Sequence, residues 1–155
     1  MNTTTKTSFV IGTLIIIIVV LLIIGNRQTT TEIVSETGTE IPCLPNGHQQ
    51  VASHIHPDLV IFTDGEPEVI PGNIGITATC MREVHTHDAA GRIHVETAEP
   101  GVVYTLADFY TVWDENIERP GYNVQFIKDA EEVSSAEELV LEDGSEIVVV
   151  YTSVE

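Results

Sequence analysis

The feature that most constrains this chain is an uncharged apolar run, Phe9–Ile24 (FVIGTLIIIIVVLLII). A helix rises about 1.5 Å per residue, so a run of this length just crosses the hydrocarbon core of a membrane with little tilt. We therefore predict a single transmembrane anchor at residues 9–25. A cleaved signal peptide is the alternative, but its cleavage site needs small residues, and here only Gly25 follows Leu-Leu-Ile-Ile.

The charges on either side of the run predict its orientation. The amino terminus and Lys6 precede the run, whereas Arg27 gives way to acidic residues. Basic residues favour the cytoplasmic side, so residues 1–8 should form a cytoplasmic tip. Residues 26–41 are polar and rich in threonine and should form a flexible stalk. Residues 42–155 then form one folded domain outside the cytoplasm, held at the cell membrane by a single pass.

The charge of the predicted domain excludes one class of partner. All 24 acidic residues follow residue 28, and the net charge of that part is about −20, because only four basic residues oppose them: Arg82, Arg92, Arg119 and Lys128. A nucleic acid would be repelled by such a surface. Cations would be attracted to it, but the same composition also suits solubility in a saline medium. Both explanations of the charge stay open.

The two cysteines of the chain, Cys43 and Cys80, both lie on the predicted outer side of the membrane. An oxidising compartment favours a disulfide between them, which would close a loop of about 38 residues and stabilise the domain by about 3–4 kcal/mol in the chain-entropy model. A pair of metal-bound thiolates is the alternative.

Alternating and turn-forming residues predict a small α+β domain, mostly of antiparallel strands with one principal helix. Thr105 and Asp108 form a capping box that opens a helix at Leu106–Trp113. Its apolar residues recur at i, i+3, i+4 and i+7 and should face a core. The strands and extended segments that we predict are residues 54–62, 68–70, 74–79, 82–87, 92–96, 122–128 and 147–152.

Five of the six histidines occupy alternating positions of two predicted strand regions. A four-residue connection, Asp88–Gly91, should place His85 opposite His94 and His87 opposite Arg92. One face of this pair then carries Glu83, His85, His87, Arg92, His94 and Glu96, and the other carries Val84, Thr86, Ile93 and Val95. A connection of another length would set histidines beside Ile93 and Val95, so the alternation supports this register.

The earlier strand repeats the arrangement, because His54, His56 and Asp58 share one of its faces. Neutral imidazoles are common ligands of Zn²⁺ and Cu²⁺, and rings at i and i+2 can lean onto one ion. We therefore predict a site for one divalent ion, Cu²⁺ or Zn²⁺, with five ligands to choose from: His54, His56, His85, His94 and His87. Arg92 beside His87 argues against a cation at that end. Asp58, Asp88 and Glu96 should accept hydrogen bonds from ring N–H groups and orient them.

Four segments carry a resemblance to a known family. They are H-x-H-P-D-L-x-I-F at His54–Phe62, H-T-H-D-x-x-G-x-I-H-V-E at His85–Glu96, T-L-x-D-F-Y-x-V-W at Thr105–Trp113, and D-G-S-E-I-V-V-V-Y at Asp143–Tyr151. With them the chain resembles a family of small, membrane-anchored extracytoplasmic proteins of bacteria and archaea with a His-rich motif. The resemblance implies that the four segments form one unit outside the cytoplasm. It brings no activity with it.

Three functions are compatible with these features. A metal-binding domain that stores or delivers an ion, or serves as an accessory subunit of a membrane complex, is favoured because the sequence has no G-x-S-x-G, H-E-x-x-H or Gly-rich phosphate loop. The second is a metalloenzyme with three histidine ligands, an open position for water, and Glu83 or Glu96 as general base. The third is a structural subunit in which the histidines form a metal-free network and the membrane helix packs with partner helices.

Overall fold

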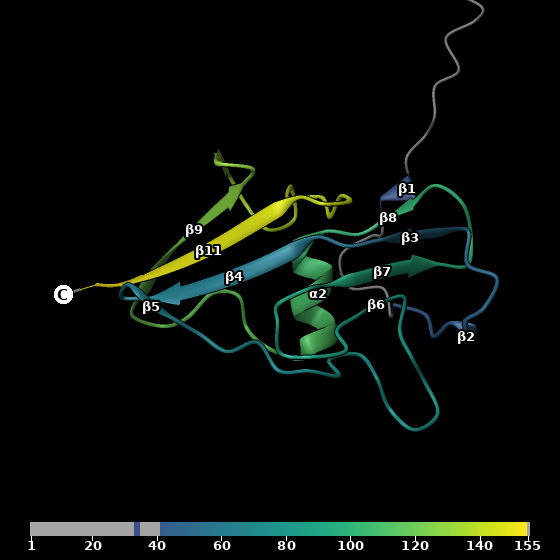
Figure 1. Cartoon of the computed structure of the whole chain (residues 1–155). Helices are drawn as coiled ribbons and strands as arrows, with labels where there is room; N and C mark the ends of the chain where they lie inside the picture. Colours follow the sequence, from purple (N-terminus) through teal and green to yellow (C-terminus); the bar gives the residue numbers. More distant parts are fainter. Residues whose placement is uncertain (1–32, 35–40, 155) are drawn as a thin grey trace, which may run out of the picture. The chain divides into compact units, whose positions relative to one another are not determined.

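A computed structural model describes residues 33–34 and 41–154 of the chain (Figure 1). The predicted cytoplasmic tip, the predicted anchor at 9–25 and most of the predicted stalk lie outside these residues. Within the described ranges, none of the helical segments combines the length and hydropathy that a membrane crossing requires. The described residues form a small β-rich domain with one short helix, as the alternation predicts.

The larger of the domain's sheets has five strands, in the order β10 (Glu131–Val133), β9 (Tyr122–Lys128), β11 (Glu146–Ser153), β4 (Asp58–Thr63) and β5 (Glu66–Pro67). The strands predicted at 122–128 and 147–152 are confirmed as β9 and β11. β11 is antiparallel to β9 but parallel to β4, with Ile147 opposite Leu59. The prediction of a mostly antiparallel domain thus holds except between β11 and β4 and in the short parallel pair of β1 (Ile33–Val34) with β8 (Val102–Val103). The short strand predicted at 68–70 is wrong, because the chain pairs two residues earlier, at β5.

The second sheet has three short strands, β3 (Ser53–Ile55), β7 (His94–Thr97) and β6 (Val84–His85), with β7 in the middle. The predicted register is confirmed, because His85 lies opposite His94 and Val84 opposite Val95. β3 pairs with the other edge of β7 and sets His54 opposite Glu96.

The strand predicted at residues 54–62 is in fact two strands that belong to different sheets. Figure 1 shows β3 leading directly into β4, and only His56 and Pro57 separate them. Proline has no N–H to donate to a ladder, so a strand cannot be paired continuously through it. The Pro57 carbonyl instead accepts from the Ile93 N–H at 2.9 Å, and the His56 N–H donates to the Asp143 side chain at 2.9 Å. The chain therefore passes from one sheet into the other within two residues.

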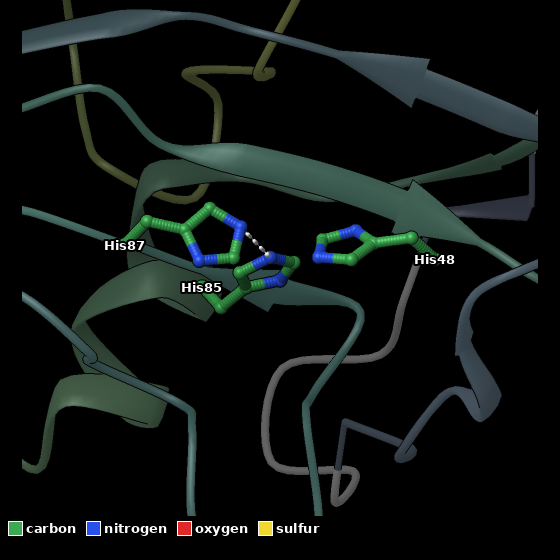
Figure 2. A group of neighbouring side chains, drawn as sticks. All are labelled: His48, His85 and His87. Carbon is green, nitrogen blue, oxygen red and sulfur yellow. Dashed lines mark hydrogen bonds between the residues drawn. The ribbon is translucent and has the colours of Figure 1, made fainter.

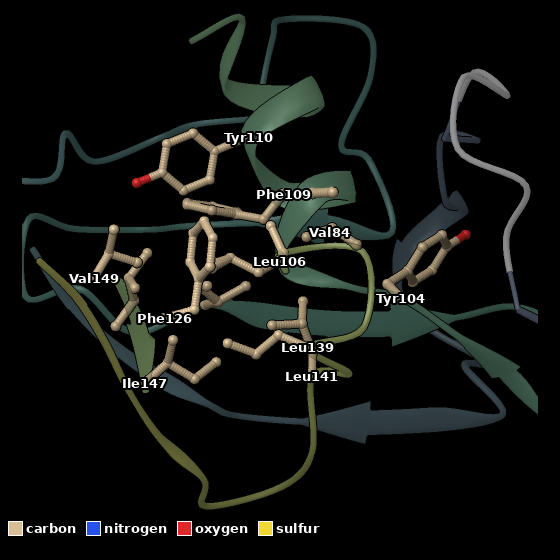
Figure 3. Close-up of a cluster of buried hydrophobic side chains, with 14 of the residues drawn as sticks. Val84, Tyr104, Leu106, Phe109, Tyr110, Phe126, Leu139, Leu141, Ile147 and Val149 are labelled. Carbon is tan, nitrogen blue, oxygen red and sulfur yellow. The ribbon is translucent and has the colours of Figure 1, made fainter. Parts of the chain in front are cut away.

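The helix, α2 (Leu106–Trp113), has the predicted bounds and the predicted capping box. The Thr105 side chain accepts from the Asp108 N–H, and the Asp108 carboxylate accepts from the Thr105 N–H at 2.8 Å. One side of the helix is buried and forms the core with the five-stranded sheet and the segment before β11. Figure 3 shows this core, in which Leu106, Phe109 and Tyr110 face a set of apolar side chains: Phe126, Leu139, Leu141, Ile147 and Val149.

Three features concern the predicted stalk and the start of the domain. Ile41 is only 3% exposed and belongs to the core, so the folded part begins at least one residue before the predicted start at 42. β1 (Ile33–Val34), inside the predicted stalk, pairs with β8 (Val102–Val103). The disulfide between Cys43 and Cys80 is confirmed, and it fastens the segment before β2 (Pro45–His48) to the segment before β6.

Candidate metal centre

All six histidines of the chain gather around the three-stranded sheet. Their rings form one connected cluster, in which neighbouring ring centroids lie between 4.5 Å (His54–His56) and 6.3 Å (His48–His54) apart. The five predicted ligands come from β3, β6, β7 and the residues next to them. The sixth, His48, comes from the end of β2 and is the residue that the sequence pattern missed. It stands alone in a loop-like stretch, and the one signal for it was the disulfide, which limits its distance from His85.

The cluster divides into two groups of three. The first group, which we call the outer triad, consists of His54, His56 and His94, and each ring offers a nitrogen within 4.8 Å of the other two. His54 Nε2 and His94 Nδ1 lie 3.4 Å apart. Two nitrogens on one tetrahedral Zn²⁺ would be roughly 3.3–3.4 Å apart, given Zn–N bonds of about 2.0–2.1 Å. The pair already has the separation that a shared ion requires.

The second group, the inner triad, consists of His48, His85 and His87, whose nitrogens also lie within 4.8 Å of one another. Figure 2 shows the three rings turned toward a common point, and the dashed line joins His85 Nε2 to His87 Nε2 at 3.3 Å. His85 Nδ1 donates to the Arg82 carbonyl at 2.9 Å. In a neutral ring this bond leaves the lone pair on Nε2, facing the other two rings. Metal-binding histidines are usually oriented by such a bond.

Glu96 lies between the two triads and is fully buried. Its two oxygens accept from His48 Nδ1 at 2.7 and 2.8 Å, and its Oε1 lies 3.0 Å from His54 Nε2. Its backbone N–H donates to the Glu83 carbonyl at 2.7 Å, which holds the residue in place. A buried carboxylate needs such donors, because removing the charge from water is costly. Glu96 thus has the position expected of an acceptor that orients a ring, and it contacts both triads.

Asp58 and Asp88, the other two expected acceptors, take different partners. Asp58 forms an ion pair with Arg92, whose Nε and Nη2 donate to it at 3.0 and 3.3 Å. Asp88 accepts from the Ala90 N–H at 2.9 Å and so shapes the turn that it begins. The expected pairing of His87 with Arg92 is also not formed, since the β6–β7 ladder ends at His85 and His94. The Arg92 side chain therefore pairs with Asp58 at the start of β4 and not with His87.

Glu83 was expected on the histidine face, but its side chain joins a different group of contacts. It accepts from the Tyr104 hydroxyl at 2.5 Å and from the Ala98 N–H at 2.7 Å, and the residue is only 4% exposed. Burial raises the pKa of Tyr104, so that its hydroxyl stays protonated and continues to donate. Both oxygens of Glu83 are therefore engaged away from the rings, and this residue is not placed to act as a general base there.

The protonation of two of the imidazoles suits metal binding. Burial lowers the pKa of His85 to about 4, and burial together with the neighbouring histidines lowers the pKa of His94 to about 4. Both rings are thus neutral near pH 7. A neutral imidazole keeps a lone pair, which is the form that binds a metal ion.

A cleft of about 620 Å³ opens beside the outer triad. Its wall includes His56 and His94 together with three carboxylates and one guanidinium, those of Asp58, Asp88, Asp143 and Arg92. The side chains of His54 and His56 are 41% and 37% exposed. The outer triad is therefore accessible from solvent. In the inner triad His48 and His87 are exposed, and only His85 is fully buried.

These histidine and glutamate groups could hold a metal ion, since they have the donor atoms, the spacing and the neutral rings that an ion needs. Comparisons of the chain with protein-family models, with curated proteins and with solved structures found no match.

Proposed function

We propose that this protein is a membrane-anchored, extracytoplasmic metal-binding protein that holds a divalent ion, Zn²⁺ or Cu²⁺, in the outer triad. It stores the ion or passes it on, by itself or as an accessory subunit of a membrane complex. The observation that carries the proposal is the outer triad itself. Three imidazoles from β3, β7 and the β3–β4 junction converge, with two nitrogens 3.4 Å apart, at an open cleft.

The donor set supports the choice of ion. The site offers nitrogens and the Glu96 carboxylate, while both cysteines are tied up in the disulfide. Imidazole and carboxylate suit Zn²⁺ and Cu²⁺, whereas Cu⁺ prefers thiolate and thioether sulfur. The one methionine after the apolar run, Met81, does not supply a thioether set.

Exposure of the triad supports storage or delivery. An ion held by His54 and His56, both more than a third exposed, can be reached by a competing ligand from a partner. The three carboxylates at the cleft and the strongly acidic surface raise the local concentration of cations. Both features favour exchange of the ion over permanent burial.

The test uses the full-length protein, purified in detergent without an added histidine tag and freed of metal by a chelator. It is dialysed against buffered Zn²⁺ or Cu²⁺, and bound metal is measured by element analysis and by competition with a chromophoric chelator. We expect tight binding in the parent protein and loss of an ion in the His54→Ala/His56→Ala variant. Gln125→Ala, at an exposed position of β9, is the control and should bind like the parent. Less than a tenth of an equivalent in the parent protein would refute the proposal.

A metalloenzyme is the second candidate, and the cleft is the observation that favours it. Its volume of about 620 Å³ lies within the usual range of small-molecule sites. An enzyme of this kind needs an exchangeable ligand on its ion. Azide should then change the visible spectrum of the Co²⁺-loaded protein, and a spectrum that azide leaves unchanged argues for a closed, non-catalytic site.

A metal-free structural network is the third candidate. Among the described residues no buried side-chain nitrogen or oxygen lacks a hydrogen-bond partner, and the His54–His94 and His85–His87 ring contacts form without an ion. This candidate predicts that the thermal unfolding temperature is the same with and without Zn²⁺. Our proposal predicts a rise that grows with the free Zn²⁺ concentration, because an ion that binds only the folded state stabilises it.

A further inference from the structure

We infer that the histidine cluster is a two-ion site, with a second divalent ion in the inner triad and with Glu96 coupling the two positions. The inference deepens the proposed function and rests on it. The sequence analysis predicts one ion shared among five histidines. The structure instead separates six histidines into two groups of three.

The two triads have no residue in common, although His85 and His94 approach each other and form a third possible ligand group with Glu96. Each triad contains one pair of ring nitrogens at a ligand-to-ligand distance, His54 Nε2 to His94 Nδ1 at 3.4 Å and His85 Nε2 to His87 Nε2 at 3.3 Å. A single ion has room for one of these pairs plus one or two more ligands. Six imidazoles are more than one Zn²⁺ or Cu²⁺ ion needs, since structural zinc sites take four ligands and catalytic ones three.

The inner triad has its rings oriented for an ion by contacts outside the triad. His48 donates from Nδ1 to Glu96, and His85 donates from Nδ1 to the Arg82 carbonyl. Both rings then keep their lone pair on Nε2, the nitrogen that points away from the bond already made. His87 Nε2 lies 3.3 Å from His85 Nε2 and supplies the third nitrogen. Carboxylate and carbonyl partners of this kind fix the tautomer of metal-binding histidines in general.

Glu96 is placed to act on both ions. Its Oε1 lies 3.0 Å from His54 Nε2 and 3.9 Å from His94 Nδ1, and these separations suit a fourth ligand of the outer ion. The same carboxylate accepts the His48 N–H at 2.7 and 2.8 Å and so orients a ligand of the inner ion. A third possible ligand group, His85, His94 and Glu96, takes a histidine from each triad. Two nearby cations repel each other, and a buried negative charge between them offsets that repulsion.

The test counts ions in the full-length protein in detergent, with variants that empty one triad at a time. His54→Ala/His56→Ala empties the outer triad. His48→Ala/His87→Ala empties the inner triad. The two side chains that this variant removes are exposed, so the fold should tolerate the change. We expect two equivalents of Zn²⁺ or Cu²⁺ in the parent protein and one in each double variant. Circular dichroism of each variant confirms that it is folded before ions are counted.

Proximity of the ions is measured in the same samples loaded with Cu²⁺. Two neighbouring Cu²⁺ ions broaden each other's electron paramagnetic resonance lines, so the parent protein should give a broadened spectrum. Each double variant should give the sharp spectrum of an isolated ion. Glu96→Gln keeps an oxygen that can accept from His48 but removes the negative charge. We expect this variant to bind each of the two ions at least tenfold more weakly than the parent protein does.

The possible failures are distinguishable. If the parent protein binds one equivalent of metal and only the His54→Ala/His56→Ala variant loses it, the second ion site is overturned and the proposed function stands. One equivalent that both variants lose would also overturn the second site, because a single ion would then be using both triads. No bound metal in the parent protein would overturn the two-ion inference and the proposed function together.

Discussion

The two main sheets of this domain share one apolar core, but they differ in how many polar side chains they bury. The five-stranded sheet and α2 enclose mainly apolar residues at their contact, among them Leu59, Ile61 and Phe109. The three-stranded sheet buries Val84 and Val95 on one side, but it also buries His85, Glu83 and Glu96. An apolar core is stabilised without a ligand, because burial itself is favourable. A buried polar group is stable only while its partners are present, so this sheet is the part of the domain that can respond to a metal ion.

The largest change in the free energy of unfolding should come from a substitution in the apolar core. Phe109→Ala removes a fully buried ring of α2 and should lower the free energy of unfolding of the metal-free protein by about 3–5 kcal/mol. Urea denaturation measures the change. Val60→Ala, on the neighbouring β4 but 43% exposed, is the matched control and should cost far less. Equal losses in the two variants would mean that the core does not lie where the structure places it.

Removal of the disulfide should have the next largest effect on stability, and it should weaken metal binding mainly at the inner triad. Replacing both cysteines, in Cys43→Ser/Cys80→Ser, should destabilise the domain by about 3–4 kcal/mol, because the unfolded chain regains its loop entropy. The bond fastens the segment that carries His48. We therefore expect Zn²⁺ affinity to fall more at the inner triad than at the outer one, as measured by chelator competition. The same loss at both triads would contradict this assignment.

Tyr104→Phe tests the polar side of the three-stranded sheet away from the rings. The variant leaves Glu83 with only the Ala98 N–H, and a buried acceptor that loses a donor costs about 1–3 kcal/mol. Denaturation with urea measures the loss. Tyr122→Phe, at a partly exposed ring of β9, should change stability by less than about 0.5 kcal/mol. Metal binding should be unaffected in both variants, since neither tyrosine belongs to a triad.

The smallest effect concerns an ion pair at the far end of the five-stranded sheet. The hydrogen bond from Arg119 lowers the pKa of Glu68 below its ordinary value of 4.5. The folded state thus favours the charged carboxylate, and the stabilisation is present above pH 4.5 and is lost as the pH falls through the lowered pKa. In urea titrations at several pH values, Glu68→Gln should be less stable than the parent protein at pH 7. The difference should shrink below pH 4.5. A difference that stays constant with pH would mean that the stability contributed by the ion pair does not depend on protonation of Glu68.

The parts of the fold that the sequence predicts well are those with a local signal. The capping box at Thr105 and Asp108 sets the start of α2, and the short connection after β6 sets His85 opposite His94. β10 was not predicted, because it is a short edge strand that begins with two glutamates.

The break between β3 and β4 left no trace in the alternation. Ile55, Leu59 and Ile61 keep the same odd positions on both sides of Pro57, although they serve different sheets. His48 shows the same limit at the candidate site. Its place in the inner triad depends on the fold of a segment held by the disulfide, so no spacing pattern pointed to it.

The position of β11 has a consequence for the timing of folding during synthesis. β11 separates β4 from β9 in the five-stranded sheet, and it is the last strand of the domain to be made. Until residues 146–153 emerge from the ribosome, β4 and β9 have no common neighbour, and contacts so distant in sequence form slowly. The His56 N–H donates to the Asp143 side chain just before the same strand, so this contact of the histidine cluster also forms late. In a growing chain the five-stranded sheet therefore remains open until its last strand, β11, has been made.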